Sequence, residues 1–272
     1  DFDKGISIVK DRKQLATRAK EAEEAFRAAL KADPKNHLAK YNLGLLIQRR
    51  GGSLAQQMYK DTLSINSSYL PARARLYGLK LSEATTEEER AKWIGKLEEM
   101  VTCPEDVDCD KIKEKDPYQP EARNILAGLA IEEERWEDAA RHARNVLLGD
   151  PDNINAYVNL AVTYFRQGLA DQTWLIVSNA LERQPTAAAL HNLMGLVHLR
   201  KDDSSRATKS FLRALDEDPL LVEAKMNLAA LELSYGDFES ALKRFDEILA
   251  VKRKHKGQKL PADPMVVMSR AV

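Results

Sequence analysis

Residues 151–185 read PDNINAYVNLAVTYFRQGLADQTWLIVSNALERQP, a stretch that begins and ends with proline. Proline returns at a constant interval of 34 residues, at Pro117, Pro151, Pro185 and Pro219. A fixed period of this length indicates stacked copies of one supersecondary unit. Since proline cannot continue a helix, each of these residues is expected to lie just past the second helix of a unit.

The residues between the prolines keep the same register when Pro120 is numbered as position 1 of a unit. Small residues recur at positions 8 and 20, which are Ala127, Ala161, Gly195 and Ala229, then Ala139, Thr173, Ala207 and Ala241. Larger apolar residues recur at positions 7 and 28, which include Leu126, Leu160, Leu147 and Leu181. The small rows allow two helices to approach closely, and the large rows fill the space around that contact.

This pattern resembles the tetratricopeptide repeat (TPR). Asn159-Leu160-Ala161 and Asn227-Leu228-Ala229 match the core of the family's first helix, and Gly236-Asp237-Phe238 matches its inter-helix turn. The resemblance implies an all-α fold, a TPR α-solenoid in which antiparallel helix pairs form a right-handed superhelix with a concave inner face. It also implies a protein that binds other proteins and is not an enzyme.

The register divides the chain into four parts. Four regular repeats of 34 residues occupy 120–253, and a linker with the start of a further helix follows over 254–272. Residues 37–119 form two irregular repeats with a loop insertion at about 102–115, and residues 1–36 form a degenerate first repeat or a cap with one long helix.

The irregular repeats also contain sequence patterns that predict where their helices and turns lie. In the first repeat the register places the first helix over Asp3 to Ala16. The second repeat opens at Asn42-Leu43-Gly44 and turns at Gly51-Gly52. In the third repeat Thr86 and Glu89 form the pattern of a capping box, which predicts the start of its second helix.

Composition argues against several classes of function. The 272 residues are 44% hydrophobic and carry 42 basic and 42 acidic side chains, so the net charge is +0. A nucleic-acid-binding protein usually has a basic excess, and the one basic run, at 252–256, is typical of a solvated helix end. No apolar stretch reaches the length of about 20 residues that spans a bilayer. We therefore expect no nucleic acid and no membrane span.

Cys103 and Cys109 are the two cysteines of the chain, and five residues separate them in the insertion. Their proximity predicts a disulfide and an oxidising compartment. Two free thiols are the main alternative, and a metal site lacks nearby third and fourth ligands. The chain begins with Asp1 and not with Met, which suggests a trimmed start, and residues 236–272 resemble TPR proteins of bacterial gliding-motility machinery. Together these features favour a periplasmic or outer-membrane-associated protein, with a cytoplasmic one as the alternative.

No motif predicts catalysis or a cofactor. The chain has no glycine-rich phosphate loop. His191 and His198 lie two turns apart on one helix face, but they occupy positions 4 and 11, where the repeat places core-facing residues. We expect both histidines to be structural, and we expect no metal, no cofactor and no enzymatic activity.

The inner face of the first helices is the candidate binding surface. The resemblance implies that positions 2, 5, 6, 9, 12 and 13 point into the concave groove. Those positions supply one asparagine per repeat, an apolar row and two arginines: Asn124, Asn159, Asn192 and Asn227; Phe165, Leu199 and Leu233; Arg166 and Arg200. They predict a groove for a partner segment, with apolar anchors, amides for its backbone and arginines for its acidic side chains. The alternative is that neighbouring helices already bury these residues.

The predicted function is a protein–protein interaction scaffold in a bacterial envelope assembly, such as a motility or secretion machine. A cytosolic assembly or co-chaperone-like adaptor is the alternative. TPR co-chaperones hold a C-terminal carboxylate with a Lys/Asn/Asn/Lys/Arg clamp. The corresponding positions here are Asn124, Gly128, Asn159, Ala189 and Leu193, so only one asparagine matches. The sequence therefore does not predict that clamp.

Overall fold

The computed structural model describes residues 1–10, 12–49, 52–103 and 115–254. All regular elements in these ranges are α-helices, and they fall into two compact units. The described residues up to Leu126 form the first unit, and those from Ala127 form the second. The chain is therefore an α-solenoid, as predicted.

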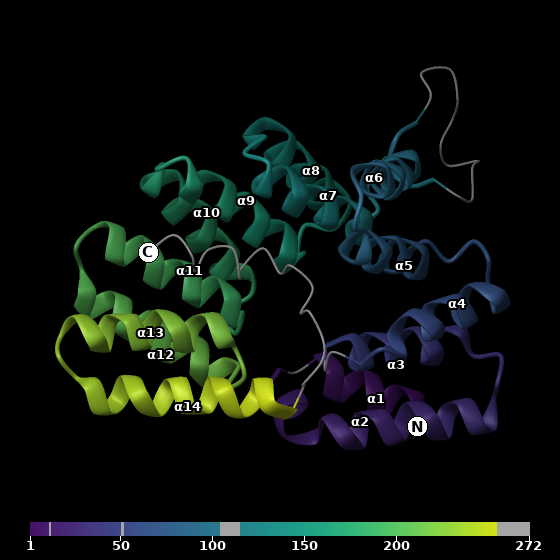
Figure 1. Cartoon of the computed structure of the whole chain (residues 1–272), viewed down its shortest axis with the longest axis horizontal. Coiled ribbons are helices and arrows are strands. Elements are labelled where there is room, and N and C mark those ends of the chain that lie inside the picture. The colour runs from purple at the N-terminus through teal and green to yellow at the C-terminus, as the bar shows by residue number, and fades with distance from the viewer. Residues whose placement is uncertain (11, 50–51, 104–114, 255–272) are drawn as a thin grey trace. The chain divides into compact units, whose positions relative to one another are not determined.

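The first unit consists of consecutive helices, each packed against the next one from α1 to α6 (Figure 1). They are α1 (Phe2–Lys10), α2 (Arg12–Ala32), α3 (His37–Arg49), α4 (Ala55–Ile65), α5 (Leu70–Glu83), α6 (Glu87–Val101) and the start of α7 (Pro120–Glu132).

The second unit continues the same alternation from the end of α7. Its helices are α8 (Trp136–Gly149), α9 (Ile154–Arg166), α10 (Ala170–Arg183), α11 (Ala188–Arg200), α12 (Ser204–Glu217), α13 (Val222–Ser234) and α14 (Phe238–Lys254). In each repeat the first helix is called helix A and the second helix B.

The small residues of the regular repeats lie where the register places them. All eight residues at positions 8 and 20 are buried. At Gly195 a Cβ would lie 2.4 Å from Cε1 of Phe211, which is closer than any real contact of this kind. Glycine at this position therefore allows helix B to carry a phenylalanine in the core of the hairpin.

A glycine also packs against an aromatic ring in two repeats of the first unit. In the first repeat this glycine is not the residue that the register predicts for the close contact. A Cβ at Gly44 would lie 2.8 Å from the Tyr59 ring, and one at Gly5 would lie 2.7 Å from the Phe26 ring. The close approach in the first repeat thus uses Gly5, whereas the register assigned that place to Lys10. All described residues from 3 to 16 are helical, in α1 and at the start of α2, and α2 has non-helical backbone angles at Arg18, just past the predicted end of the first helix.

The turn between helices A and B has one conformation in all four regular repeats. Position 15 adopts a positive φ in each, at Glu134 (57°), Gly168 (80°), Asp202 (58°) and Gly236 (77°). Glycine takes this conformation without steric cost, whereas an L-residue with a side chain loses about 1–2 kcal/mol there. The repeat geometry thus imposes the turn even where the sequence supplies no glycine.

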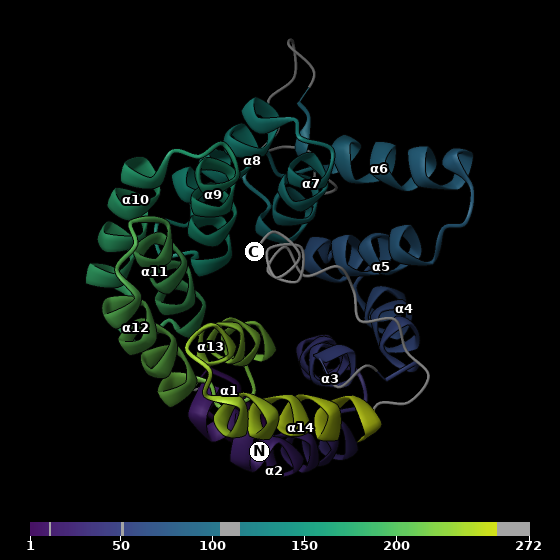
Figure 2. The same ribbon diagram turned by 60° about the vertical axis from the view of Figure 1, so that its left-hand side comes forward.

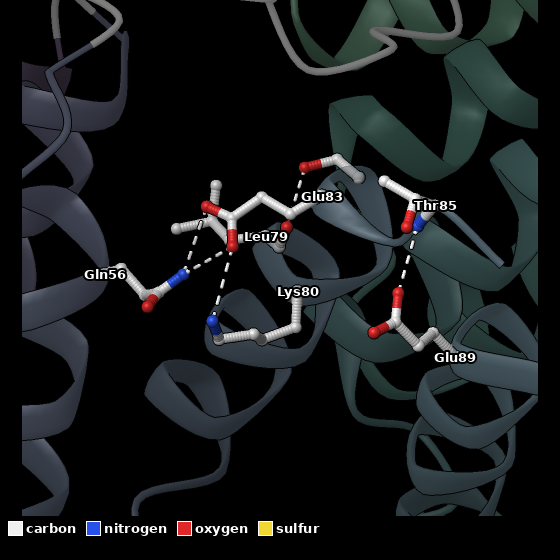
Figure 3. Close-up of polar contacts among 7 residues, drawn as sticks. Gln56, Leu79, Lys80, Glu83, Thr85 and Glu89 are labelled. Carbon is white, nitrogen blue, oxygen red and sulfur yellow. Dashed lines mark hydrogen bonds and ion pairs between the residues drawn. The ribbon is translucent and has the colours of Figure 1, made fainter.

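The third repeat contains the predicted capping interaction, part of which Figure 3 shows. The Thr86 hydroxyl accepts a hydrogen bond from the Glu89 amide at 3.2 Å. The Glu89 carboxylate accepts one from the Thr85 amide at 3.0 Å, as Figure 3 shows. Two backbone donors at the start of α6 are satisfied in this way. Nearby, Gln56 of α4 donates to the Glu83 carboxylate at 2.9 Å and ties α4 to the end of α5 (Figure 3).

Two predictions lie partly outside the described residues. Cys109 and most of the insertion, residues 104–114, are among the undescribed positions, so the bridge between Cys103 and Cys109 stays a prediction. The linker and further helix predicted for 254–272 are undescribed from residue 255 onward.

Candidate functional site

The A helices of the second unit form the surface on which a partner was predicted. Helices α9, α11 and α13 contact one another directly and line the inner side of this unit, whereas α10, α12 and α14 lie on its outer side (Figure 2). The side chains between adjacent A helices are therefore shared by two repeats.

Two of the predicted asparagines bond to each other across this contact. The amide nitrogen Nδ2 of Asn227 donates to Oδ1 of Asn192 at 2.9 Å, and the two side chains are 7% and 1% exposed. A buried amide that is left without a partner costs about 1–3 kcal/mol, so this pair stabilises the α11–α13 contact. These two amides face a neighbouring repeat in the free chain.

The other two predicted asparagines, Asn159 and Asn124, are not part of this hydrogen bond. Asn159 is 2% exposed, and its main-chain carbonyl accepts a hydrogen bond from the Thr163 hydroxyl at 2.7 Å. Asn124 is half-buried on α7, in the first unit. Asn159 is thus covered within the second unit, and Asn124 belongs to a different unit from the other three.

Phe165 is also covered, and an arginine of the next repeat covers it. The ring is 8% exposed, and Cζ of Arg200 lies 4.3 Å from its centroid. Nη1 of Arg200 donates to the main-chain carbonyl of Phe165 at 3.0 Å. The guanidinium therefore makes a cation–π contact and caps the end of α9 at the same time.

The remaining predicted residues become more exposed toward the end of the array. At position 12, Ile131 is 3% exposed, Leu199 is half-buried and Leu233 is 42% exposed. Arg166 is half-buried, and Arg200 is exposed apart from its contact with Phe165. Exposure at position 12 therefore increases from Ile131 to Leu233 along the described chain.

The exposed Leu233, a predicted anchor, belongs to an apolar stripe that also includes Met226, a residue that the sequence prediction did not name. Met226 is half-buried and Ala230 is exposed, and they occupy positions 5 and 9 of the same helix. Residues spaced by four and then three positions share one face of a helix. Met226, Ala230 and Leu233 therefore form an apolar stripe, which we call the α13 stripe. The regular register could have revealed it, since all three are inner-face positions.

At the inner-face positions of its A helices, the first unit has polar and aromatic residues in place of an apolar row. The Tyr41 hydroxyl donates to Oε1 of Glu121 at 3.2 Å, and the guanidinium of Arg75 interacts electrostatically with Tyr41. Burial, with a smaller contribution from the Glu121 carboxylate, raises the pKa of Tyr41. Tyr59 is fully buried beside it, with ring centroids 5.9 Å apart. This cluster joins side chains of three A helices and one B helix in the first unit.

The two histidines have different surroundings. Nε2 of His191 lies 2.8 Å from the main-chain carbonyl oxygen of Pro185, and Arg123 bonds to Pro117 at the same positions two repeats earlier. Position 4 thus ties helix A to the preceding proline turn. Desolvation lowers the pKa of His198, which favours its neutral form. Among the described residues, no three His, Cys, Asp or Glu side chains are grouped so that they could hold a metal.

No helix in the described ranges has both the length and the apolar content needed to cross a membrane. This finding concerns those ranges alone.

Comparisons with known proteins agree with the helix pattern. Family models of the tetratricopeptide repeat match residues 16–58, 130–197 and 192–257. The structure is similar to that of a tetratricopeptide repeat protein from Parabacteroides merdae, with a TM-score of 0.56 and 18% identity over 94% of this chain and 96% of that chain. That likeness shows the fold.

One curated relative shares sequence over a short stretch. The chain is 34% identical over 77 residues to the Superkiller complex protein 3 of Homo sapiens. The matched stretch is 28% of this chain and 5% of that protein, so this chain spans only a small part of the relative. Together with the repeat register, the family models and the similar fold settle the family. The chain belongs to the tetratricopeptide repeat family, and its repeats indicate a scaffold for protein–protein interaction.

Proposed function

We propose that this protein is a non-catalytic scaffold that binds a segment of a partner protein on the inner face of its second unit. The observation that carries the proposal is the α13 stripe, an apolar helix face whose side chains are more exposed than their counterparts in the preceding repeat. At position 9, Leu196 of α11 is 2% exposed, whereas Ala230 of α13 is exposed. An apolar face of this kind is suited to pack against a partner's apolar side chains.

The proposal gives the inner-face residues roles that differ from those predicted from the sequence. Leu233 is the proposed central anchor, with Leu199 at its edge, and Arg200 would favour an acidic residue in the partner. Phe165 and the Asn192–Asn227 pair would act indirectly, because they hold the A helices in register. Recognition in this proposal therefore depends on few exposed residues and on a rigid framework beneath them.

Leu233→Asp tests the proposal, with Leu212→Asp as a matched control. Leu212 is 46% exposed on α12, close to the 42% of Leu233, so the two substitutions should cost similar stability. The partner would be isolated with the wild-type chain and purified, and its Kd would be measured for each variant by calorimetry. We expect Leu233→Asp to weaken binding at least tenfold, since it places a charge in a desolvated apolar contact. Leu212→Asp should change the Kd less than twofold.

Equal affinities for the two variants, or a larger loss with Leu212→Asp, would contradict a partner site on α13. Circular dichroism of both variants checks that the helices are intact.

The proposal extends to the setting of the scaffold. A bacterial envelope assembly, such as a motility or secretion machine, is the first candidate, and it rests on the predicted bridge between Cys103 and Cys109. A cytosolic adaptor is the second candidate.

Thiol titration distinguishes these settings. We expect protein purified without reductant from its native source to show no reactive thiol until it is unfolded and reduced. Because the bridge would close a small loop, reduction should leave the helical circular dichroism nearly unchanged. Two thiols that titrate at once in the unfolded, unreduced protein would count against the oxidising compartment.

A further inference from the structure

A cavity of about 200 Å³ lies in the first unit, between the start of α5 and the end of α6. It is lined by residues of α5, residues of α6 and the residue that precedes the α7 turn: Arg73 and Tyr77; Lys96, Glu99 and Met100; Lys115. Arg73 and Tyr77 occupy positions 4 and 8 of their repeat, so the cavity lies apart from the inner-face positions. Nothing in the proposed partner site uses these residues.

The described residues of the lining carry three positive charges and one negative charge. Nζ of Lys96 donates to the Glu99 carboxylate at 3.2 Å, which compensates one of the cations. Arg73 and Lys115 instead donate to main-chain carbonyl oxygens, those of Ser67 at 2.5 Å and Thr102 at 2.9 Å.

A carbonyl oxygen accepts a hydrogen bond but carries no formal charge. The described lining thus retains two uncompensated positive charges, in a chain whose net charge is +0. The excess is therefore a local feature, and it attracts anions to this place.

The cations are also partly removed from water. Arg73, Lys96 and Lys115 are all half-buried, and Met100 is 3% exposed. Tyr77 adds an aromatic wall, since its ring centroid lies 5.6 Å from that of Trp93. Charges interact more strongly in such surroundings than at a fully hydrated surface, because the local dielectric constant is lower.

We propose that this cavity binds a carboxylate side chain of an acidic segment in a partner protein. Its volume lies below the roughly 300–1,000 Å³ of typical small-molecule pockets, but it accommodates one acidic side chain. The planar guanidinium of Arg73 can pair with both oxygens of a carboxylate, and Lys115 supplies a second positive charge. The cavity would give the scaffold a second point of attachment, in a different unit from the α13 stripe.

Fluorescence anisotropy with a labelled hexapeptide of Asp and Glu tests this proposal on the full chain. The double variant Arg73→Gln/Lys115→Gln removes the two uncompensated cations. Its matched control is Lys31→Gln/Lys60→Gln, which removes two exposed cations of the same unit and changes the net charge equally. We expect the first variant to weaken peptide binding at least tenfold and the control to weaken it less than twofold. An Asn/Gln version of the peptide should not bind.

Several results would overturn the proposal. Equal losses in both double variants would show a general charge effect, and binding of the Asn/Gln peptide would show that the carboxylates are not recognised. Failure of the acidic peptide to bind at millimolar concentration would exclude the site. If inorganic phosphate displaced the peptide at equal concentration, the cavity would be a site for free anions. Leu233→Asp should leave peptide binding unchanged, so this test and that of the α13 stripe fail independently.

Discussion

Replacing Phe211 with alanine is expected to lower the free energy of unfolding by about 3–5 kcal/mol. The side chain is fully buried, and it is the ring against which Gly195 packs. Removing it leaves a cavity at the crossing of α11 and α12 that the two helices cannot close without moving. Chemical denaturation followed by circular dichroism measures the effect, and Leu212→Ala, at the exposed neighbouring position, should change stability by less than about 1 kcal/mol.

The glycine opposite that ring provides the control. Gly195→Ala should cost about 1–3 kcal/mol, because its Cβ would lie 2.4 Å from the ring. Combined with Phe211→Leu, the same substitution should cost clearly less, since the aromatic ring that it meets is gone. Strictly additive effects in this double-mutant cycle would contradict the glycine–ring packing.

Replacing Phe165 with alanine is expected to cost about 3 kcal/mol or more, and to leave partner affinity nearly unchanged in the folded protein. Its ring is 8% exposed and supports Arg200, so the loss combines a cavity with a lost cation–π contact. Phe165→Leu retains most of the volume and should cost less than about 1.5 kcal/mol. Denaturation and calorimetry on the same samples separate the two effects. Retained stability with lost affinity would mean that Phe165 contacts the partner directly.

The regular repeats were predictable because their period fixes the packing. Once the prolines gave the 34-residue interval, the small residues at positions 8 and 20 identified the helix crossings, and all eight are buried. The first repeat was not predictable in the same way. Its close contact uses Gly5, five positions before Lys10, the residue to which the register assigns that contact.

The candidate site was harder to predict, because burial on an inner face depends on the next helix. The sequence gives Phe165, Leu199 and Leu233 equivalent positions, yet one is covered, one half-buried and one exposed. Nor could the sequence show that Tyr41 and Glu121, 80 positions apart, form a hydrogen bond inside the first unit. Such contacts follow from the way the repeats stack, which local patterns do not encode.

Site-specific photo-crosslinking tests the central claim most directly. A p-benzoylphenylalanine residue would replace Leu233 on α13 in one sample and Leu212 on α12 in another, and each would be irradiated with the purified partner. The proposed function predicts a crosslinked complex from position 233 and almost none from position 212. Crosslinking from position 212 with none from position 233 would show that the partner does not bind the inner face of α13.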